Sequence, residues 1–407
     1  MSENLNYYIN HDDKFHLHTY KRLPVCFARG EGVYLWDTED RRYVDFISGL
    51  GVVNLGHVRP EVTDALCRQA GKLIHVSNLF YTRPQAVLAE QLVNLAMPGG
   101  KCFFANSGAE ANEGAIKLAR RWGKRNFGAG KHEIITALRS FHGRTMKTLA
   151  ATGQPEKQKP FEPLPGGFRH VPYNDLAALE NVIGEDTCAV LLEVVQGEGG
   201  VYVADQEYLK GVRRLCDERD VLLIFDEVQS GLGRTGKMFA WEHFGARPDI
   251  MTLAKALANG LPIGALVTSD KAADAFDYGD HGSTFGGGPP VCAAASAVLN
   301  VMMTEDIPRQ ATTAGDFLRQ GLIGLATRSP GLIKEVRGLG LMLGMELSRP
   351  IGRDVVLDML SRGYIINNIG DQVLRFLPPL IISEEQTIGM LQNLELSLGA
   401  AAKGDSQ

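Results

Sequence analysis

The sequence predicts an α/β fold: a large domain with a mainly parallel sheet flanked by helices, and a smaller α+β domain at its C-terminal end. Two patterns indicate this. Short apolar runs alternate with longer segments of helical period, and the alternation stops near residue 300. Size agrees, because 407 residues, 44% of them hydrophobic, can bury a large core and predict two or three domains.

The expected strands are short and apolar. They span 101–107, 132–138, 188–195, 221–227, 249–255 and 263–269. Helices are expected between several of them: the segment 108–125 places Ala115, Leu118 and Ala119 on one apolar face, and 205–220 follows a strand later in the chain. Strands that alternate with helices form parallel sheets that are covered on both faces.

The chain is expected to divide into three parts. Residues 1–50 form an N-terminal segment that packs with the small domain, and 32–46 within it form a β-hairpin that turns at Thr38 to Asp40. Residues 51–300 form the large ligand-binding domain. Residues 301–407 form the small domain, which begins with a long helix.

Composition argues against several classes of function. A net charge of -5 and a pI near 6.1 disfavour a nucleic-acid partner. Six scattered cysteines suggest neither a disulfide framework nor a zinc site. The N-terminus is polar and no apolar run is long enough to span a bilayer, so we expect a cytoplasmic protein without membrane contact. His11, His16 and His18 are better explained by a solvated arm than by a metal site.

The first candidate binding residues follow strand 101–105. In open α/β sheets the ligand lies at the carboxyl ends of the strands. Ser107 and Glu110 match the S-x-x-E capping box of a helix start. The small residues Gly108 and Ala109 leave backbone N–H groups accessible to an anion such as phosphate. The alternative is a well-capped helix that binds no ligand.

Two charged residues follow other strands. Asp226 ends strand 221–225, and Lys255 ends strand 249–254. Burial lowers the pKa of a lysine and makes its amine a nucleophile, although a lysine that reaches solvent or pairs with Asp226 is the simpler interpretation of Lys255 alone. A phosphate site, a carboxylate and a lysine in one crevice are what pyridoxal phosphate requires for its phosphate, its pyridine nitrogen and its aldehyde.

A nicotinamide-dependent dehydrogenase is the remote alternative. Gly231, Gly233 and Gly236 have the G-x-G-x-x-G spacing of a dinucleotide-binding turn. That fingerprint requires its first glycine directly after the strand, whereas residues 226–230 intervene here. The acidic candidate, Asp249, precedes the next strand instead of ending it. A non-catalytic scaffold has no reason to line one crevice with the three groups above.

The motifs taken together resemble a known family. "FFANSGAEANEGAIKLAR", "FHGRT", "VVQGEGG", "LLIFDEVQSGLGRTG", "PDIMTLAKALANGLPIGA" and "GSTFGGGPP" are similar, in order, to signatures of the class III, fold type I pyridoxal-phosphate aminotransferases. The resemblance runs from about residue 20 to 395 and implies an obligate homodimer with two shared active sites. The implied cofactor contacts are Lys255 in a Schiff base with the aldehyde, Asp226 on the pyridine nitrogen, Gln229 near the ring hydroxyl, Ser107, Gly108 and Ala109 on the phosphate, Phe141 stacked on the ring, and Thr284 on the phosphate of the neighbouring subunit.

Within this class, "FHGRT" followed by "VPYNDLAAL" most resembles the acetylornithine aminotransferases, which use N-acetylornithine and 2-oxoglutarate. The resemblance implies that Arg144 holds the donor's α-carboxylate, that Arg375 holds a carboxylate of glutamate or 2-oxoglutarate, and that Glu198 pairs with Arg375 to screen it. Without the resemblance, a structural salt bridge, a surface charge on an edge strand and a turn cap are the simpler interpretations of Arg144, Arg375 and Glu198.

The choice of donor stays open. Val194, Gly288 and Pro290 depart from the residues frequent in the class, whereas Leu50 replaces a tyrosine that grips free ornithine in the ornithine δ-aminotransferases. Ornithine, N-succinyl-diaminopimelate, 4-aminobutyrate and a carrier-bound lysine precursor are the alternative donors.

Overall fold

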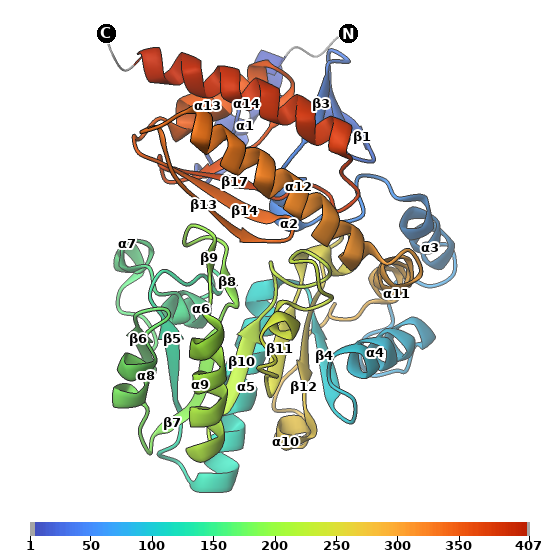
Figure 1. Ribbon diagram of the computed structural model, residues 1–407. Coiled ribbons are helices and arrows are strands. Elements are labelled where there is room, and N and C mark those ends of the chain that lie inside the picture. The colour runs from blue at the N-terminus through green and yellow to red at the C-terminus, as the bar shows by residue number, and fades with distance from the viewer. Residues whose placement is uncertain (1–4, 405–407) are drawn as a thin grey trace.

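The central element is a seven-stranded sheet in the order β4-β12-β11-β10-β7-β5-β6, within residues 5–404, which a computed structural model describes (Figure 1). Its strands are β4 (Lys101–Ala105), β12 (Gly264–Thr268), β11 (Ile250–Leu253), β10 (Leu222–Asp226), β7 (Thr187–Leu192), β5 (Glu133–Ala137) and β6 (Phe168–Val171). Only β12 runs against its neighbours, and the others are parallel. The predicted mainly parallel sheet is confirmed.

Helices cover both faces of this sheet. Successive residues of a strand point to opposite faces, and both faces here carry apolar side chains that pack against helices. On β10, Leu222 and Ile224 belong to the core beneath α5 (Gly108–Phe127). The alternate residues Leu223 and Phe225 belong to the core beneath α9 (Gln206–Glu218) and α8 (Leu176–Val182). A strand that is buried on both faces consists of consecutive apolar residues, and residues 222–225 are such a run.

Strand β6 was not predicted, because its four residues "FRHV" include two polar ones and show no clear alternation. The long helix expected after residue 300 is confirmed by α12 (Ile307–Arg328), and a separate helix, α11 (Pro289–Thr304), precedes it. Asp306 between them adopts a left-handed conformation with φ 48° and breaks the helical path.

The N-terminal strands and the C-terminal part of the chain lie together above the large sheet (Figure 1). One sheet has the order β1-β2-β3-β15, in which β3 pairs in parallel with β15, and the other has the order β13-β14-β17-β16. The hairpin predicted at 32–46 is confirmed by the antiparallel pair β2–β3. The strands are β1 (Phe27–Glu31), β2 (Tyr34–Asp37), β3 (Arg42–Asp45), β13 (Ile333–Leu339), β14 (Met342–Leu347), β15 (Tyr364–Ile365), β16 (Asn367–Ile369) and β17 (Val373–Phe376). The domain boundaries at residues 50 and 300 stay a prediction.

The remaining elements are mostly helices around these sheets. α11 packs against α3 and α4, and α14 packs against α12 and α13. Within residues 5–404, no helix has the length and apolar character needed to cross a membrane. The bounds are α1 (Leu5–Phe15), α2 (Ser48–Gly51), α3 (Pro60–Ala70), α4 (Arg83–Ala96), α6 (Met146–Ala151), α7 (Pro155–Gln158), α10 (Asp270–Ala273), α13 (Gly352–Ser361) and α14 (Glu384–Gly404), the 3₁₀ turns η1 (Lys159–Phe161), η2 (Ala240–His243) and η3 (Lys255–Ala258), and the short strands β8 (Val195–Gln196) and β9 (Tyr202–Val203).

Candidate active site

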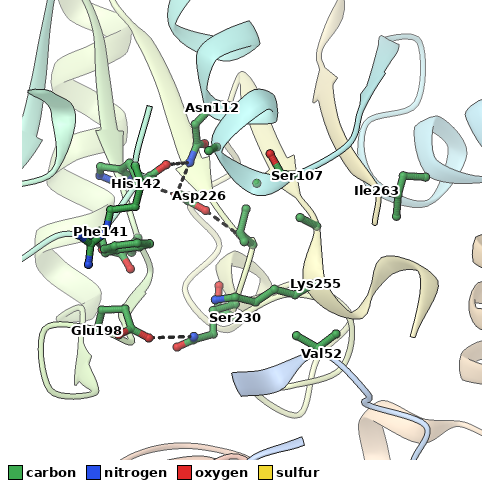
Figure 2. A pocket seen from close by; sticks show the side chains of 18 of the residues that line it. Val52, Ser107, Asn112, Phe141, His142, Glu198, Asp226, Ser230, Lys255 and Ile263 are labelled. Carbon is green, nitrogen blue, oxygen red and sulfur yellow. Dashed lines mark hydrogen bonds and ion pairs between the residues drawn. The ribbon is translucent and has the colours of Figure 1, made fainter. Parts of the chain in front are cut away.

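A cavity of about 470 Å³ lies at the carboxyl ends of the parallel strands. Its walls are the segments that follow β4, β5, β7, β10 and β11, and Val52, directly after α2, closes one side (Figure 2). This is the position at which open α/β sheets bind ligands. Of the residues expected at the site, the cavity wall contains Ser107, Gly108, Ala109, Phe141, Arg144, Glu198, Asp226, Gln229 and Lys255.

The start of α5 forms one wall. Ser107 is the N-cap, and its Oγ accepts a hydrogen bond from the backbone N–H of Glu110 at 3.2 Å. The carboxylate of Glu110 accepts the backbone N–H of Asn106 at 2.6 Å, the residue before the N-cap, so only the Ser107 half of the predicted capping box is formed. The N–H groups of Gly108 and Ala109 lie in the first helical turn, where the helix itself offers no acceptor, and both residues line the cavity. A side chain at Gly108 would come within 2.8 Å of Val228.

Asp226 is buried and held from three directions. Its Oδ2 accepts a hydrogen bond from Nδ2 of Asn112 at 2.7 Å and lies 2.9 Å from Nδ1 of His142, while Oδ1 accepts the N–H of Val228 at 3.1 Å (Figure 2). Asn112 comes from α5 and is fixed in turn by Thr252 Oγ1 at 2.7 Å. Neither Asn112 nor His142 was predicted as a site residue, although a polar residue on the apolar face of a predicted helix was a usable signal for Asn112.

The neighbouring carboxylate, Glu227, has a different role. It accepts hydrogen bonds from Ser230 Oγ at 2.6 Å and from the N–H groups of Ala240 and Trp241 at 3.1 and 2.9 Å. Burial raises the pKa of Glu227 to about 7, and these hydrogen bonds oppose the increase. Glu227 therefore organises the loop after β10, and only Asp226 faces the cavity.

Lys255 follows β11 and begins η3 with a left-handed φ of 42°, an uncommon conformation for a residue with a side chain. Its amine is enclosed by the cavity (Figure 2). Burial lowers the pKa of Lys255, the guanidinium of Arg375 lowers it further, and the carboxylates of Glu198, Asp226 and Glu193 oppose this. Among the described residues, Lys255 has no salt-bridge partner, so the pairing with Asp226 that was the simpler interpretation is absent.

The segment after β5 brings Phe141 and Arg144 to the cavity. The guanidinium carbon of Arg144 lies 5.6 Å from the centre of the Phe141 ring. Arg144 is exposed and has no salt-bridge partner within the described part of the chain, which disagrees with a structural salt bridge. The backbone N–H of Phe141 donates to Oε2 of Glu193 at 2.9 Å. Burial, aided by Asp226, raises the pKa of Glu193, a carboxylate directly after β7 that was not predicted as a site residue.

Arg375 lies behind this wall on β17, between β14 and β16, and is 1% exposed. The interpretation as a surface charge on an edge strand is therefore wrong. Its Nη1 lies 2.6 Å from Oε1 of Glu198 and also donates to the carbonyl of Gly197 at 3.2 Å. Burial would raise the pKa of Glu198, but Arg375, Lys255 and the amide of Gln229 together lower it to about 2.

Two expected residues lie elsewhere. Thr284 is exposed and lines a separate small pocket with His75, Ser77 and Gln85. Leu50 is not among the residues that line the cavity, and its backbone carbonyl accepts a hydrogen bond from Nε2 of Gln229 at 3.5 Å.

The residues present fit pyridoxal phosphate. The free N–H groups of the first turn of α5 suit a phosphate. Oε1 of Gln229 is buried without a partner among the described residues and can accept a hydrogen bond from a ring hydroxyl. Asp226 and Lys255 line the same cavity as these groups. The fold and this set of donors together define a pyridoxal-phosphate enzyme of fold type I.

Comparisons with known proteins agree. The chain belongs to the class-III aminotransferase family, whose sequence model matches residues 16–398. The acetylornithine aminotransferase of Methanocaldococcus jannaschii is 49% identical over 388 residues, which cover 95% of this chain and 97% of that protein. The protein is therefore a pyridoxal-phosphate-dependent aminotransferase.

Solved structures of the family superimpose over almost the whole chain. An ornithine aminotransferase from Toxoplasma gondii, described with partial occupancy of PLP at its active site, has a TM-score of 0.95 and 31% identity and covers 100% of this chain and 96% of its own. An acetylornithine aminotransferase from Elizabethkingia anophelis has a TM-score of 0.88 and 35% identity, with 98% and 100% covered.

Proposed function

We propose that the protein transfers the ω-amino group of N-acetylornithine, or of a closely related acylated diamino acid, to 2-oxoglutarate and so forms the semialdehyde and glutamate. In this proposal it acts in arginine biosynthesis in the cytoplasm. The observation that carries the proposal is the pairing of buried Arg375 with Glu198 beside an unpaired Arg144. The 49% identity to an acetylornithine aminotransferase over nearly the full length supports it.

The cofactor contacts follow from the positions of the cavity residues. Ser107, Gly108 and Ala109 bind the phosphate, and Phe141 stacks on the ring. Asp226 holds the proton on the pyridine nitrogen, and its bonds to Asn112 and His142 keep the carboxylate aimed at the cavity. Bound pyridoxal phosphate supplies an electrophilic aldehyde and an electron sink. Gln229 lies at the ring hydroxyl.

Lys255 has two tasks in this proposal. Its amine holds the cofactor covalently between reaction cycles. Once free, the same amine would act as the general base that takes the proton from the reacting carbon of the substrate. Burial favours the neutral amine that both tasks need, because it lowers the pKa of Lys255.

Two arginines divide the recognition of substrate carboxylates. Arg144, exposed at the cavity mouth without a carboxylate partner among the described residues, binds the α-carboxylate of the donor. Arg375 binds a carboxylate of glutamate or 2-oxoglutarate. While the acylated donor is bound, Glu198 occupies Arg375, and the incoming carboxylate later replaces Glu198, so one charged pair is exchanged for another.

We further propose a homodimer with shared active sites. Thr284 lies outside the cavity of its own chain and is exposed, which suits a contact with the cofactor phosphate of a second subunit. Large apolar side chains nearby in the structure are also exposed, among them Leu79, Phe80, Tyr81 and Phe285. A cluster of this kind usually marks a protein interface.

Free ornithine is the second candidate donor, because solved structures named as ornithine aminotransferases match this fold closely. Leu50 argues against it, since an aliphatic side chain cannot provide the hydroxyl of the tyrosine that grips ornithine in those enzymes. N-Succinyl-diaminopimelate, 4-aminobutyrate and a carrier-bound lysine precursor are further alternatives.

A panel of donors, each assayed with 2-oxoglutarate and ranked by kcat/KM, tests the proposal. We expect N-acetylornithine to rank first, with ping-pong kinetics. Sedimentation of the holoenzyme tests the dimer. A higher kcat/KM for ornithine or 4-aminobutyrate would replace the proposed donor without changing the class of enzyme.

A further inference from the structure

The loop that carries Glu198, residues 197–200, connects β8 to β9 and lies against the C-terminal sheet (Figure 1). From here it is called the Glu198 loop. Arg375, on β17, binds its first residue through the Gly197 carbonyl at 3.2 Å. A second arginine, Arg337 on β13, binds its last residue by donating from Nε to the carbonyl of Gly200 at 2.9 Å. The loop is therefore held at both ends by the same sheet.

The side chain of Arg337 is buried and is held in place by several partners. Its side chain is 8% exposed, and its guanidinium lies 4.1 Å from the centre of the Tyr202 ring on β9. Its Nη1 forms ion pairs with Glu335 at 2.7 Å and Glu346 at 2.6 Å, which fix the plane of the guanidinium. Only a planar group with several donors can stack on a ring, pair with two carboxylates and donate to a carbonyl at once.

The glycines of the Glu198 loop are closely packed. Gly197, Gly199 and Gly200 lie on both sides of Glu198, where glycine by itself would permit the backbone to move. An added Cβ would lie 1.7 Å from Gln229 Oε1 at Gly197 and 2.6 Å from the Arg139 carbonyl at Gly199. At Gly200, with φ +121°, it would lie 2.9 Å from the Tyr202 ring. Close contacts on three sides leave the backbone little room to move.

We propose that Arg337 is a positioning residue for substrate selection: by holding Gly200, it fixes the backbone of the Glu198 loop, so that Glu198 releases Arg375 by rotation of its side chain alone. The inference rests on the proposed function, in which the Glu198–Arg375 pair determines whether the site accepts the acylated donor or glutamate. A fixed backbone returns Glu198 to Arg375 whenever no second carboxylate is bound. A loosened loop leaves Arg375 open while the acylated donor occupies the cavity.

The test compares Arg337→Gln and Arg337→Lys with the matched control Lys334→Gln. Lys334 pairs with the same Glu346 at 2.8 Å but is 67% exposed and does not contact the loop. Stopped-flow half-reactions give kcat/KM for N-acetylornithine and for glutamate separately. We expect the ratio of the first to the second to fall about tenfold in both Arg337 variants and to stay unchanged in the control.

Two outcomes would overturn the inference. Equal losses in both half-reactions would mean that Arg337 only stabilises the fold. Recovery of the wild-type ratio by Arg337→Lys would mean that the positive charge between Glu335 and Glu346 is all that matters.

Hydrogen exchange of the wild-type holoenzyme gives a second measurement, which decides the matter if the variants do not fold. The N–H of Val201, which donates to the Gln196 carbonyl at 2.9 Å, reports on the loop backbone. We expect its protection to be the same with and without saturating glutamate, and faster exchange with glutamate would contradict a fixed loop. If the wild type rejects N-acetylornithine, the proposed donor fails, while the glutamate half-reaction and this exchange still test Arg337.

Discussion

Replacing Glu198 by glutamine keeps the size of the side chain and removes the charge that pairs with Arg375. Arg375 is then left with the carbonyl of Gly197 and Oδ1 of Asn367, at 3.2 and 3.3 Å, and with no carboxylate from its own chain among the described residues. A buried guanidinium without a counter-ion attracts any carboxylate that enters the cavity. We therefore expect the variant to bind glutamate more readily and to discriminate less between the two substrates.

The size of the effect follows from the pKa of Glu198. Its lowering from 4.5 to about 2 corresponds to about 3 kcal/mol in favour of the carboxylate, at 1.36 kcal/mol per pKa unit. Lys255 and Gln229 account for part of this, and the side chain of Glu198 is 28% exposed, so we assign about half to Arg375. That half, on the order of 1–2 kcal/mol, corresponds to roughly a tenfold change in a rate ratio.

Stopped-flow measurement of the separate half-reactions is the assay. We expect the glutamate half-reaction of Glu198→Gln to be unchanged or up to about tenfold faster, and the acylated-donor half-reaction to be about tenfold slower. Glu395→Gln is a matched control, because it breaks an exposed ion pair with Arg328 that is not part of the cavity. Equal changes in both half-reactions would show that Glu198 merely caps a turn and that selectivity lies elsewhere.

Three further results are expected. Asp226→Asn should keep the cofactor and lose at least roughly a hundredfold in kcat, because a neutral partner cannot hold the pyridinium proton; unchanged single-turnover spectra with donor would show that Asp226 only ends a strand. Borohydride reduction of the yellow holoenzyme should attach a pyridoxyl group to Lys255, and peptide mapping that finds it on another lysine would contradict the assignment. The pKa of Glu227 is raised from 4.5 to about 7 in the folded protein, so its contribution to stability is complete below about pH 4.5 and is lost as the pH rises through 7. The Tm of Glu227→Gln relative to wild type should therefore rise between about pH 5 and pH 8, and a constant difference would rule out this titration.

The sequence predicted the site residues whose position is determined by a single strand and by the residues directly after it. Each apolar run predicted between residues 101 and 269 forms a strand, and residues at or just after the ends of the parallel strands line the cavity. The antiparallel strand β12 instead contributes the residues before it, 260–263. Packing across elements was not predictable in this way. Asn112 reaches Asp226 from a helix that is 114 positions earlier in the chain, and no local pattern records such a contact. His142 reaches the same carboxylate from a loop.

The glycines of the Glu198 loop are a second case in which the sequence alone does not predict the contacts between elements. From the sequence, "QGEGG" indicates conformational freedom, because glycine is permissive. The structure shows that this permissiveness serves close packing against Gln229, Arg139 and Tyr202. Whether a glycine provides motion or space depends on its neighbours in the fold, which a single sequence does not specify.

Asp226 and Glu227 show how one strand end can serve both chemistry and structure. Successive residues at the end of an extended strand point to opposite sides, so two adjacent carboxylates cannot both face one cavity. Asp226 faces it, with Asn112 and His142 fixing its direction. Glu227 points the other way, and its bonds to Ser230, Ala240 and Trp241 shape the loop that holds Gln229 beside Glu198. The second carboxyl group thus acts on the site through the loop that it organises, which explains why it is placed in the interior without facing a substrate.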